Sequence, residues 1–367
     1  QIVQFALGDV SRCFGEKYAQ YRNRPVQRNP NRDFQLMSRV LEFEGNRHEF
    51  EKPMRIISEY DVPKDAWFFQ QNSHPEWMPY SVLMEIALQP CGFISANSGA
   101  MLIYPELDLH YRNLDGNGTL SKHIDLRGKT IQAEVELYST VASGNTVIQK
   151  HRFLLKCEGL PFYKGDTVFG YFTDEALENQ TGLDGGKAKL PWLDENTSHD
   201  MKVYRLNDSN SGLESGKPHL KLAGNQLNLL DEVHLSPSVG SHSKGYAYGK
   251  RIVDPKDWFF PCHFHQDPVM PGSLGVEAIL QALQVFCIDQ KLGDSFSNPR
   301  FRPSLSQTRW KYRGQIIPTT GMMQLELHVS KIEKQDEQLM LVADASLWRD
   351  ELRIYEVQDI SLVIEEA

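Results

Sequence analysis

A tryptophan-led segment occurs twice in this chain, and this duplication restricts the folds that the chain can adopt. The second copy runs from Trp258 to Gln281, and the first runs from Trp67 to Gln89. Both begin Trp-Phe-Phe, and both have a proline that is followed six residues later by Glu-x-x-x-Gln. The two tryptophans are 191 residues apart in a chain of 367. A repeat of this length predicts two related units of domain size and excludes a short-period solenoid.

Two weaker matches lie in the same order on either side of the repeated segment. Upstream, the segment that begins at Asp33 is similar to the one that begins at Asn225, and downstream Asp125-Leu-Arg-Gly is similar to Lys311-Tyr-Arg-Gly. A stretch rich in Gly, Asn, Asp and Ser separates the copies and has the composition of a linker. The predicted organisation is therefore a lead-in (1–32), a first unit (33–172), a linker (173–218) and a second unit (219–367).

Each unit has the same predicted order of elements: a strand, the Trp-Phe-Phe loop, a long helix and then several strands. The helices are expected at about 81–98 and 273–290, and both are apolar nearly all round, which is typical of a helix enclosed by a sheet. Alternating or β-rich segments predict the strands at 54–60, 130–138, 147–158, 244–252, 322–329, 339–348 and 353–365. This pattern predicts an α+β fold in which an antiparallel sheet surrounds one helix in each unit.

The composition is that of a globular protein with a sizeable core. Hydrophobic residues make up 40% of the chain, charged residues make up 24%, and the net charge is −9. This charge disfavours a general nucleic-acid or membrane surface. The best candidate for a membrane span, 81–104, is interrupted by Glu85 and Pro90, so no span is expected. The chain begins at Gln1 rather than Met, and we expect it to be a piece of a longer polypeptide.

The cysteines and histidines indicate a reducing compartment without a metal site. The five cysteines are odd in number and form no Cys-x-x-Cys pair, which disfavours a disulfide framework or a zinc site and favours a cytoplasmic location. His219, His234 and His242 cluster loosely but lack the spacing of metal ligands. Cys262 is expected to be a small buried residue rather than a thiol nucleophile.

His263 is the best candidate for a general base, because a neutral imidazole has a pKa close to the working pH. It precedes a Pro-Gly turn at Gly272 that opens an apolar helix, where N–H groups favour an anionic oxygen. The alternative is a core histidine bonded to a carbonyl. Glu277 in this helix and Glu85 in the other each have apolar neighbours, and a buried carboxyl can be a proton donor.

The first copy of the segment lacks two of these features. Asn72 stands where the second copy has His263, and Tyr80 stands where it has Gly272. A shifted alignment would instead bring His74 to the first site. His265, two residues after the candidate base, is expected to face away from the site. Two copies of which one has lost its base predict a fused dimer with one active site.

The motifs of the second copy resemble a known family. Cys262-His-Phe followed by Asp267-Pro-Val-Met-Pro-Gly-Ser-Leu-Gly resembles the signature of FabA-like 3-hydroxyacyl-carrier-protein dehydratase/isomerases, which have a hotdog fold. Asn225-Gln-Leu and Gly314-Gln-Ile-Ile-Pro also look like that family. The duplicated arrangement, with Tyr-Arg-Asn-Leu-Asp-Gly from Tyr111, looks like the dehydratase region of polyunsaturated fatty acid synthases. The resemblance covers residues 33 to 365.

This resemblance implies a double hotdog, in which two antiparallel sheets each wrap a long helix and pair as a fused pseudo-dimer. Each active site of the family takes its histidine from one unit and its acid from the other. Carried over, His263 pairs with Glu85, and Gln89 positions this acid. The degenerate second site would combine Asn72 with Glu277 and be inactive. The family's aspartate is replaced by glutamate in both copies, which is one methylene longer.

The implied reaction is elimination of water from a (3R)-3-hydroxyacyl thioester to a trans-2-enoyl thioester, with isomerisation to the cis-3-enoyl form left open. The N–H of Gly272 would polarise the thioester carbonyl. The resemblance implies no metal or redox cofactor, a substrate carried on the phosphopantetheine of an acyl carrier protein, and contact with other synthase domains. A homodimer of double hotdogs is left open. The alternatives are a hotdog acyl thioesterase and a non-catalytic acyl-binding module.

Overall fold

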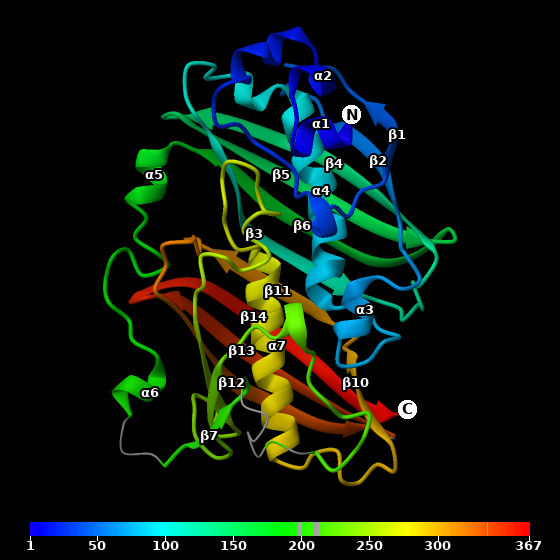
Figure 1. Cartoon of the computed structure of the whole chain (residues 1–367), viewed down its shortest axis with the longest axis vertical. Helices are drawn as coiled ribbons and strands as arrows, with labels where there is room; N and C mark the ends of the chain where they lie inside the picture. Colours follow the sequence, from blue (N-terminus) through cyan, green and yellow to red (C-terminus); the bar gives the residue numbers. More distant parts are fainter. Residues whose placement is uncertain (197–199, 208–212, 214, 336) are drawn as a thin grey trace. The chain divides into compact units, whose positions relative to one another are not determined.

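The computed structural model describes residues 1–196, 200–207, 213, 215–335 and 337–367. These residues form two compact units, and each unit is assembled from three stretches of the chain. The first unit consists of Gln1–Lys64, Leu83–Gln180 and Pro255–Pro271, and the second consists of Asp65–Val82, Thr181–Asp254 and Gly272–Ala367. Figure 1 shows one long helix lying against the strands of each unit.

The first unit has an antiparallel sheet in the order β1-β2-β4-β5-β6-β3. Its strands are β1 (Arg39–Glu44), β2 (Met54–Asp61), β3 (His110–Leu120), β4 (Thr130–Ser143), β5 (Thr146–Cys157) and β6 (Leu160–Phe172). Alternate residues of β2 are buried, as expected where one face of a strand packs on a core. The core of the unit contains the long helix α4 (Tyr80–Ser98), which enters it at Leu83.

The first unit also contains short helices. They are α1 (Ile2–Ala6), α2 (Ser11–Phe14), η1 (Glu16–Tyr21), η2 (Arg32–Phe34), η3 (Ala100–Leu102) and α5 (Asp174–Glu178). The Tyr18 hydroxyl donates to the carbonyl oxygen of Ala96 at 2.5 Å, and the Tyr21 hydroxyl donates to that of Met101 at 2.8 Å. The N-terminal lead-in is therefore part of this core.

The second unit has an antiparallel sheet in the order β11-β14-β13-β12-β9-β8-β7, and β10 also pairs with β14. Its strands are β7 (Lys202–Arg205), β8 (Glu232–Ser236), β9 (Tyr246–Ile252), β10 (Pro299–Pro303), β11 (Gln307–Tyr312), β12 (Met322–Gln335), β13 (Gln338–Arg349) and β14 (Leu352–Glu366). Its helices are α3 (Trp67–Gln71), α6 (Trp192–Glu195), η4 (Asn225–Leu227) and the long core helix α7 (Gly272–Asp289).

Each unit is thus an antiparallel sheet with one long buried helix, and the predicted α+β double hotdog class is confirmed. Both helices and all seven strands that the sequence patterns predicted are present. The patterns did not locate β1, β3, β6, β7, β8, β10 or β11. The sequence of β6 contains glycines, which ordinarily interrupt strands. A Cβ at Gly165 of this strand would lie 1.9 Å from the carbonyl oxygen of Asn117. Glycine is required there by the close approach of β3.

The compact units differ from the predicted ranges because they exchange two loops. We call Pro255–Pro271 the histidine loop and Asp65–Val82 the asparagine loop. The histidine loop belongs to the first unit, although the strands and helix on either side of it belong to the second, and the asparagine loop is exchanged in the opposite direction. The predicted linker contains α5, α6 and β7, and its residues 197–199, 208–212 and 214 lie outside the described part of the chain.

Helix α7 is long and apolar enough to cross a membrane by length and composition, which the sequence analysis did not anticipate. However, 83% of its 18 residues are buried inside the protein. The core helix of a hotdog unit passes the same test, since the sheet takes the place of the hydrocarbon around it.

Candidate active site

The histidine loop holds His263 through a pair of hydrogen bonds to one residue. The Nδ1 atom of His263 lies 3.0 Å from the carbonyl oxygen of Val269, and the Val269 N–H donates to the carbonyl oxygen of His263 at 2.8 Å. A carbonyl oxygen only accepts, so the ring proton must be on Nδ1 when the imidazole is neutral. The Nε2 atom then carries the lone pair and is the atom that can take a proton.

Burial keeps this imidazole neutral. It lowers the pKa of His263 from the ordinary value of 6.5 to about 4, and the positive charge of Arg112 acts in the same direction. The hydrogen bond from Nδ1 to Val269 and the charge of Asp267 oppose this shift but do not cancel it. At neutral pH the side chain is therefore an uncharged base rather than an imidazolium.

A second polar pair lies one helical turn apart on α4. Glu85 and Gln89 are both buried, and the Gln89 Nε2 donates to a Glu85 carboxyl oxygen at 3.3 Å. The same Nε2 donates to the carbonyl oxygen of Phe34 at 2.9 Å, and Oε1 of Gln89 accepts the Leu36 N–H at 2.9 Å. These contacts leave the amide no freedom to flip. Gln89 thus presents an N–H to the Glu85 carboxyl, as the predicted positioning role requires.

Residues 31–36, which we call the bracing segment, bind both the histidine loop and α4. The backbone N–H and the side-chain Nδ2 of Asn31 each donate to the carbonyl oxygen of Cys262 at 2.9 Å. Phe34 and Leu36 form the bonds to Gln89 described above. One segment of six residues thus holds the residue before His263 and the residue one turn after Glu85. His263 and Glu85 accordingly belong to the same compact unit, although they come from different halves of the sequence.

The second unit repeats this bracing arrangement around the asparagine loop. Here the Gly224 N–H donates to the carbonyl oxygen of Gln71 at 2.8 Å, and the Leu229 N–H donates to Oε1 of Gln281 at 2.9 Å. In both units the two backbone N–H donors are five residues apart. The carbonyl that accepts from the first donor belongs to the residue directly before His263 in one unit and directly before Asn72 in the other. Asn72 therefore occupies the position of His263, which supports the unshifted alignment of the two copies.

Asn72 reproduces the structural hydrogen bond of His263 but has no basic nitrogen. Its Nδ2 donates to the carbonyl oxygen of Trp77 at 2.7 Å, much as the ring of His263 does to Val269. Its Oδ1 accepts the backbone N–H of Ser73 at 2.8 Å. An amide nitrogen carries no lone pair that can take a proton. The asparagine loop can therefore keep its shape without being able to act as a base.

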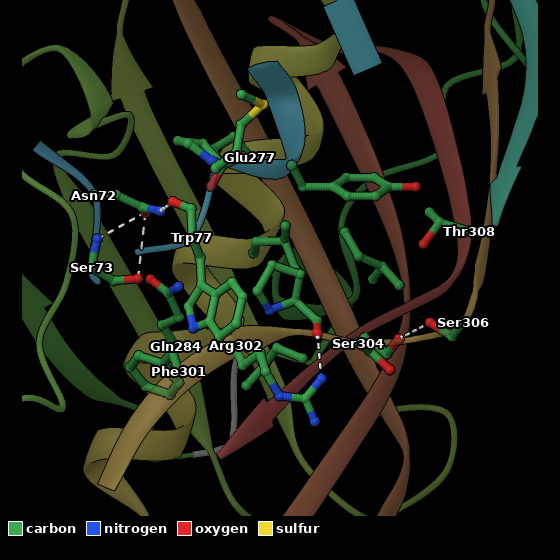
Figure 2. Close-up of a pocket in the computed structure, with 18 residues that line it drawn as sticks. Asn72, Ser73, Trp77, Glu277, Gln284, Phe301, Arg302, Ser304, Ser306 and Thr308 are labelled. Atoms are coloured by element: carbon green, nitrogen blue, oxygen red, sulfur yellow. Dashed lines mark hydrogen bonds between the residues drawn. The ribbon is translucent and has the colours of Figure 1, made fainter. Parts of the chain in front are cut away.

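Glu277 belongs to the same unit as Asn72 and lines a narrow pocket with it (Figure 2). Burial raises the pKa of the Glu277 carboxyl, although the Ser81 N–H, which donates to it at 2.9 Å, acts in the opposite direction. The cavity volume is about 40 Å³, which is room for water rather than for an acyl chain. The pocket is lined in part by Tyr80, Leu280, Gln284, Phe301, Ser304 and Thr308.

The other sequence candidates occupy less reactive positions. Gly272 begins α7, where a Cβ would lie 2.6 Å from the Tyr312 ring, so the close packing requires glycine. The thiol of Cys262 donates to the Trp258 carbonyl at 3.3 Å, and burial raises its pKa, which disfavours a nucleophile. His74 belongs to the second unit and not to the unit of Glu85. Among the described residues, no group of three or more His, Cys, Asp or Glu could hold a metal ion.

Sequence reasoning missed an ion pair that anchors the histidine loop. Two nitrogens of Arg112 on β3 each lie 2.6 Å from a carboxylate oxygen of Asp267, and His110 Nδ1 lies 3.0 Å from the same carboxylate. Arg112 lies in the Tyr-Arg-Asn-Leu segment and Asp267 in the Asp-Pro-Val-Met segment, both of which were noted as motifs. The available signal was that each of these two motifs contains a charged residue. The sequence does not show that Arg112 and Asp267 pair, because their contact depends on the histidine loop belonging to the first unit.

Comparisons with known proteins agree with the motifs. Residues 222–358 match the model of the FabA-like domain. A subunit of the polyunsaturated fatty acid synthase of Thraustochytrium sp. is 34% identical over 381 residues, covering 99% of this chain and 26% of that protein. The chain thus corresponds to about a quarter of the relative's length.

Solved structures of a dehydratase and of a thioesterase are similar to the chain to the same degree. GphF dehydratase 1 has 12% identity and a TM-score of 0.48, covering 90% of this chain and 98% of the other. The 12:0-ACP thioesterase from Umbellularia californica has 10% identity and a TM-score of 0.48, covering 84% and 93%. Likeness at this level does not distinguish a dehydratase from a thioesterase. The sequence matches are more specific: residues 222–358 match the FabA-like domain, and the chain is homologous over nearly its whole length to part of a polyunsaturated fatty acid synthase subunit.

Proposed function

We propose that the first unit catalyses elimination of water from a 3-hydroxyacyl thioester, with His263 as the base and Glu85 as the acid. The observation that carries this proposal is the bracing segment, which ties the loop of His263 and the helix of Glu85 to the same six residues. A proton relay needs a base and an acid at one substrate. The homology to part of a fatty acid synthase and the FabA-like match supply the class of substrate.

The proposed reaction needs only these two side chains. Nε2 of His263 removes the proton from C2, and the electron pair of that C–H bond forms the C2–C3 double bond. The C3–O bond breaks, and the leaving hydroxyl takes a proton from the Glu85 carboxyl and departs as water. Transfer of the proton from the imidazolium back to the carboxylate, directly or through solvent, restores the enzyme. The step involves no net oxidation or reduction, so it requires no redox cofactor, and the proposal assigns no step to a metal.

Gln89 and Gly272 have supporting roles in this proposal. Gln89 holds the Glu85 carboxyl by its amide, which is itself fixed by the bracing segment. Gly272 remains a sequence-based prediction as the donor that polarises the thioester carbonyl, because it begins α7 and the N–H groups at the start of a helix favour an anionic oxygen. Isomerisation of the product to a cis-3-enoyl thioester would use the same imidazole and is a separate measurement.

One assay tests the activity against its alternatives. The purified chain is incubated with a (3R)-3-hydroxyacyl thioester, and enoyl thioester and free thiol are both quantified. We expect enoyl thioester with retention of the thioester bond. Release of free thiol would indicate the thioesterase, and neither product would indicate an acyl-binding module without catalysis. The products therefore separate all three functions in a single experiment.

The low pKa of His263 predicts an unusual pH dependence. The base acts only when unprotonated, so an imidazole with the ordinary pKa of 6.5 would lose activity below that pH, whereas a pKa of about 4 delays the loss. We expect the loss of kcat/KM on acidification, which reports protonation of the base, to be centred near pH 4. A fall centred near pH 6.5, with the chain still folded by circular dichroism, would contradict this expectation.

We also propose that the acyl group arrives on the phosphopantetheine of an acyl carrier protein, alongside other domains of a synthase. The support is the homology to part of a fatty acid synthase. The carrier should raise kcat/KM about 10-fold or more over the same acyl group on coenzyme A, because contacts between the proteins increase encounter. Equal kcat/KM for the two substrates would count against a carrier-binding surface.

A further inference from the structure

We propose that Arg112 and Asp267 are positioning residues, which hold the exchanged histidine loop on β3 and so orient His263 for catalysis. This inference rests on the proposed function, because it concerns how the same base is aimed. It goes beyond the acid and base pair by assigning the orientation of the base to an ion pair formed by another residue of its loop, Asp267.

The Arg112–Asp267 pair has the geometry of a strong ion pair. Its two parallel contacts are both 2.6 Å long, and the side chains are only 11% and 16% exposed. Bidentate contacts of arginine with a carboxylate fix direction as well as distance. A pair with so little exposure is screened far less than a surface pair. Loss of either partner would leave the other charged and largely buried.

The carboxylate stays ionised wherever an assay would be run. Burial on its own would raise the pKa of Asp267, but the charge of Arg112 and hydrogen bonds from His110 and Arg112 outweigh it and hold the pKa well below its usual range. The stabilising contribution of the pair is therefore present above the carboxyl's unfolded pKa, which is about 3.9, and is lost only in stronger acid.

The ion pair can act on His263 because local backbone hydrogen bonds connect Asp267 to the residues around His263. Asp267 follows His263 by four residues. The Phe264 N–H donates to the Asp267 carbonyl oxygen at 3.0 Å, and the Asp267 N–H donates back to the Phe264 carbonyl oxygen at 3.2 Å. Val269 then binds both the ring and the backbone of His263. Rotation at Asp267 would therefore be transmitted to the imidazole.

The asparagine loop provides a comparison within the same chain. Glu76 follows Asn72 by four residues and contacts Arg300 of β10 at 2.9 Å. The Glu76 side chain is 45% exposed, whereas that of Asp267 is 16% exposed. The loop without a base thus has the more solvent-exposed anchor. Glu76 is accordingly a matched control at the corresponding loop position.

The test compares Arg112→Ala, Arg112→Lys and Asp267→Asn with Glu76→Gln in the full chain. We expect Arg112→Ala to lower kcat for dehydration by about 10-fold or more, because small misplacement of a base costs rate, with KM changed by less than about twofold. Arg112→Lys should recover part of the loss, since lysine restores the charge but not the fork. Asp267→Asn should resemble Arg112→Ala, and Glu76→Gln should leave kcat within about twofold of wild type.

Two further measurements separate positioning from general destabilisation. In a His263→Ala background, Arg112→Ala should lower the residual rate no further, because residues that act through one group are not additive. Amide hydrogen exchange, followed by mass spectrometry, should become faster in peptides from the histidine loop in Arg112→Ala but not in Glu76→Gln.

The outcomes distinguish this inference from the proposed function. An Arg112→Ala variant that keeps wild-type kcat and loop protection overturns the inference while leaving the function intact. An equal loss of rate in the wild-type and His263→Ala backgrounds also overturns it. A wild-type chain that forms no enoyl thioester overturns the proposed function, and hydrogen exchange in the histidine loop then still decides whether the pair holds that loop.

Discussion

His263→Ala is expected to lower kcat/KM for dehydration by about 10²-fold or more, because it removes the base that takes the C2 proton. The structure adds two reasons to the sequence motif. The Val269 carbonyl fixes the ring proton on Nδ1, so that Nε2 can accept, and burial keeps the ring neutral at the pH of the assay. The measurement is the rate of enoyl thioester formation at saturating and subsaturating substrate.

His265→Ala is the matched control for this variant, because it removes an imidazole two residues away in the same loop. We expect it to keep kcat/KM within about threefold of wild type, as surface and rim substitutions usually have small effects. Both variants should have the circular dichroism spectrum of the parent. Retained activity in His263→Ala, together with loss in His265→Ala or His74→Ala, would show that another histidine is the base.

Glu85→Gln is expected to lower dehydration by a comparable factor of about 10² or more, because the hydroxyl then leaves without a proton donor. Glutamine has nearly the same shape as glutamate, so the contact with Gln89 on α4 can be kept and the helix should stay folded. The same substitution at Glu277 is the control. In the unit of Glu277, the position that corresponds to His263 is occupied by Asn72, which cannot take a proton. Glu277→Gln should therefore change the rate far less.

The comparison of the two glutamate variants decides which half of the chain supplies the acid. Loss of turnover in Glu277→Gln with retention in Glu85→Gln, both folded, would refute the assignment of His263 to Glu85. A double variant adds a further check. His263→Ala combined with Glu85→Gln should lose little more than either alone, because the two groups act in one elimination.

The two-unit organisation, both long helices and seven of the strands could be predicted from the sequence, for local physical reasons. The helix around Glu85 and the helix around Glu277 are apolar on nearly every face, and such a helix must be enclosed whatever the rest of the chain does. The strands of the sheets have β-rich or alternating patterns, which depend on their own two faces. Strand β6 is among the strands that these patterns did not locate, and its Gly165 is required by close contact with Asn117, which lies far away in the sequence.

The candidate residues could likewise be predicted as types, since a histidine before a Pro-Gly turn and a carboxyl in an apolar helix are unusual in sequence. The prediction that His263 pairs with Glu85 came only from the resemblance to a family, because no local sequence pattern indicates which unit contains the histidine loop. That depends on contacts between segments distant in sequence: Asn31 with Cys262, and Arg112 with Asp267. The sequence alone offers an alignment of Asn72 with His263, and the corresponding bracing bonds in the two units support it.

The chain by itself therefore specifies two helix-centred units and the chemical groups available to them, since these depend on composition and short-range periodicity. Only the tertiary structure decides that the histidine loop leaves its own half and lies with Glu85. The physical reason is that buried polar groups must be paired. The carbonyl of Cys262 and the carboxylate of Asp267 are satisfied by donors of the first unit, and those donors are identified by position in space rather than by position in the chain.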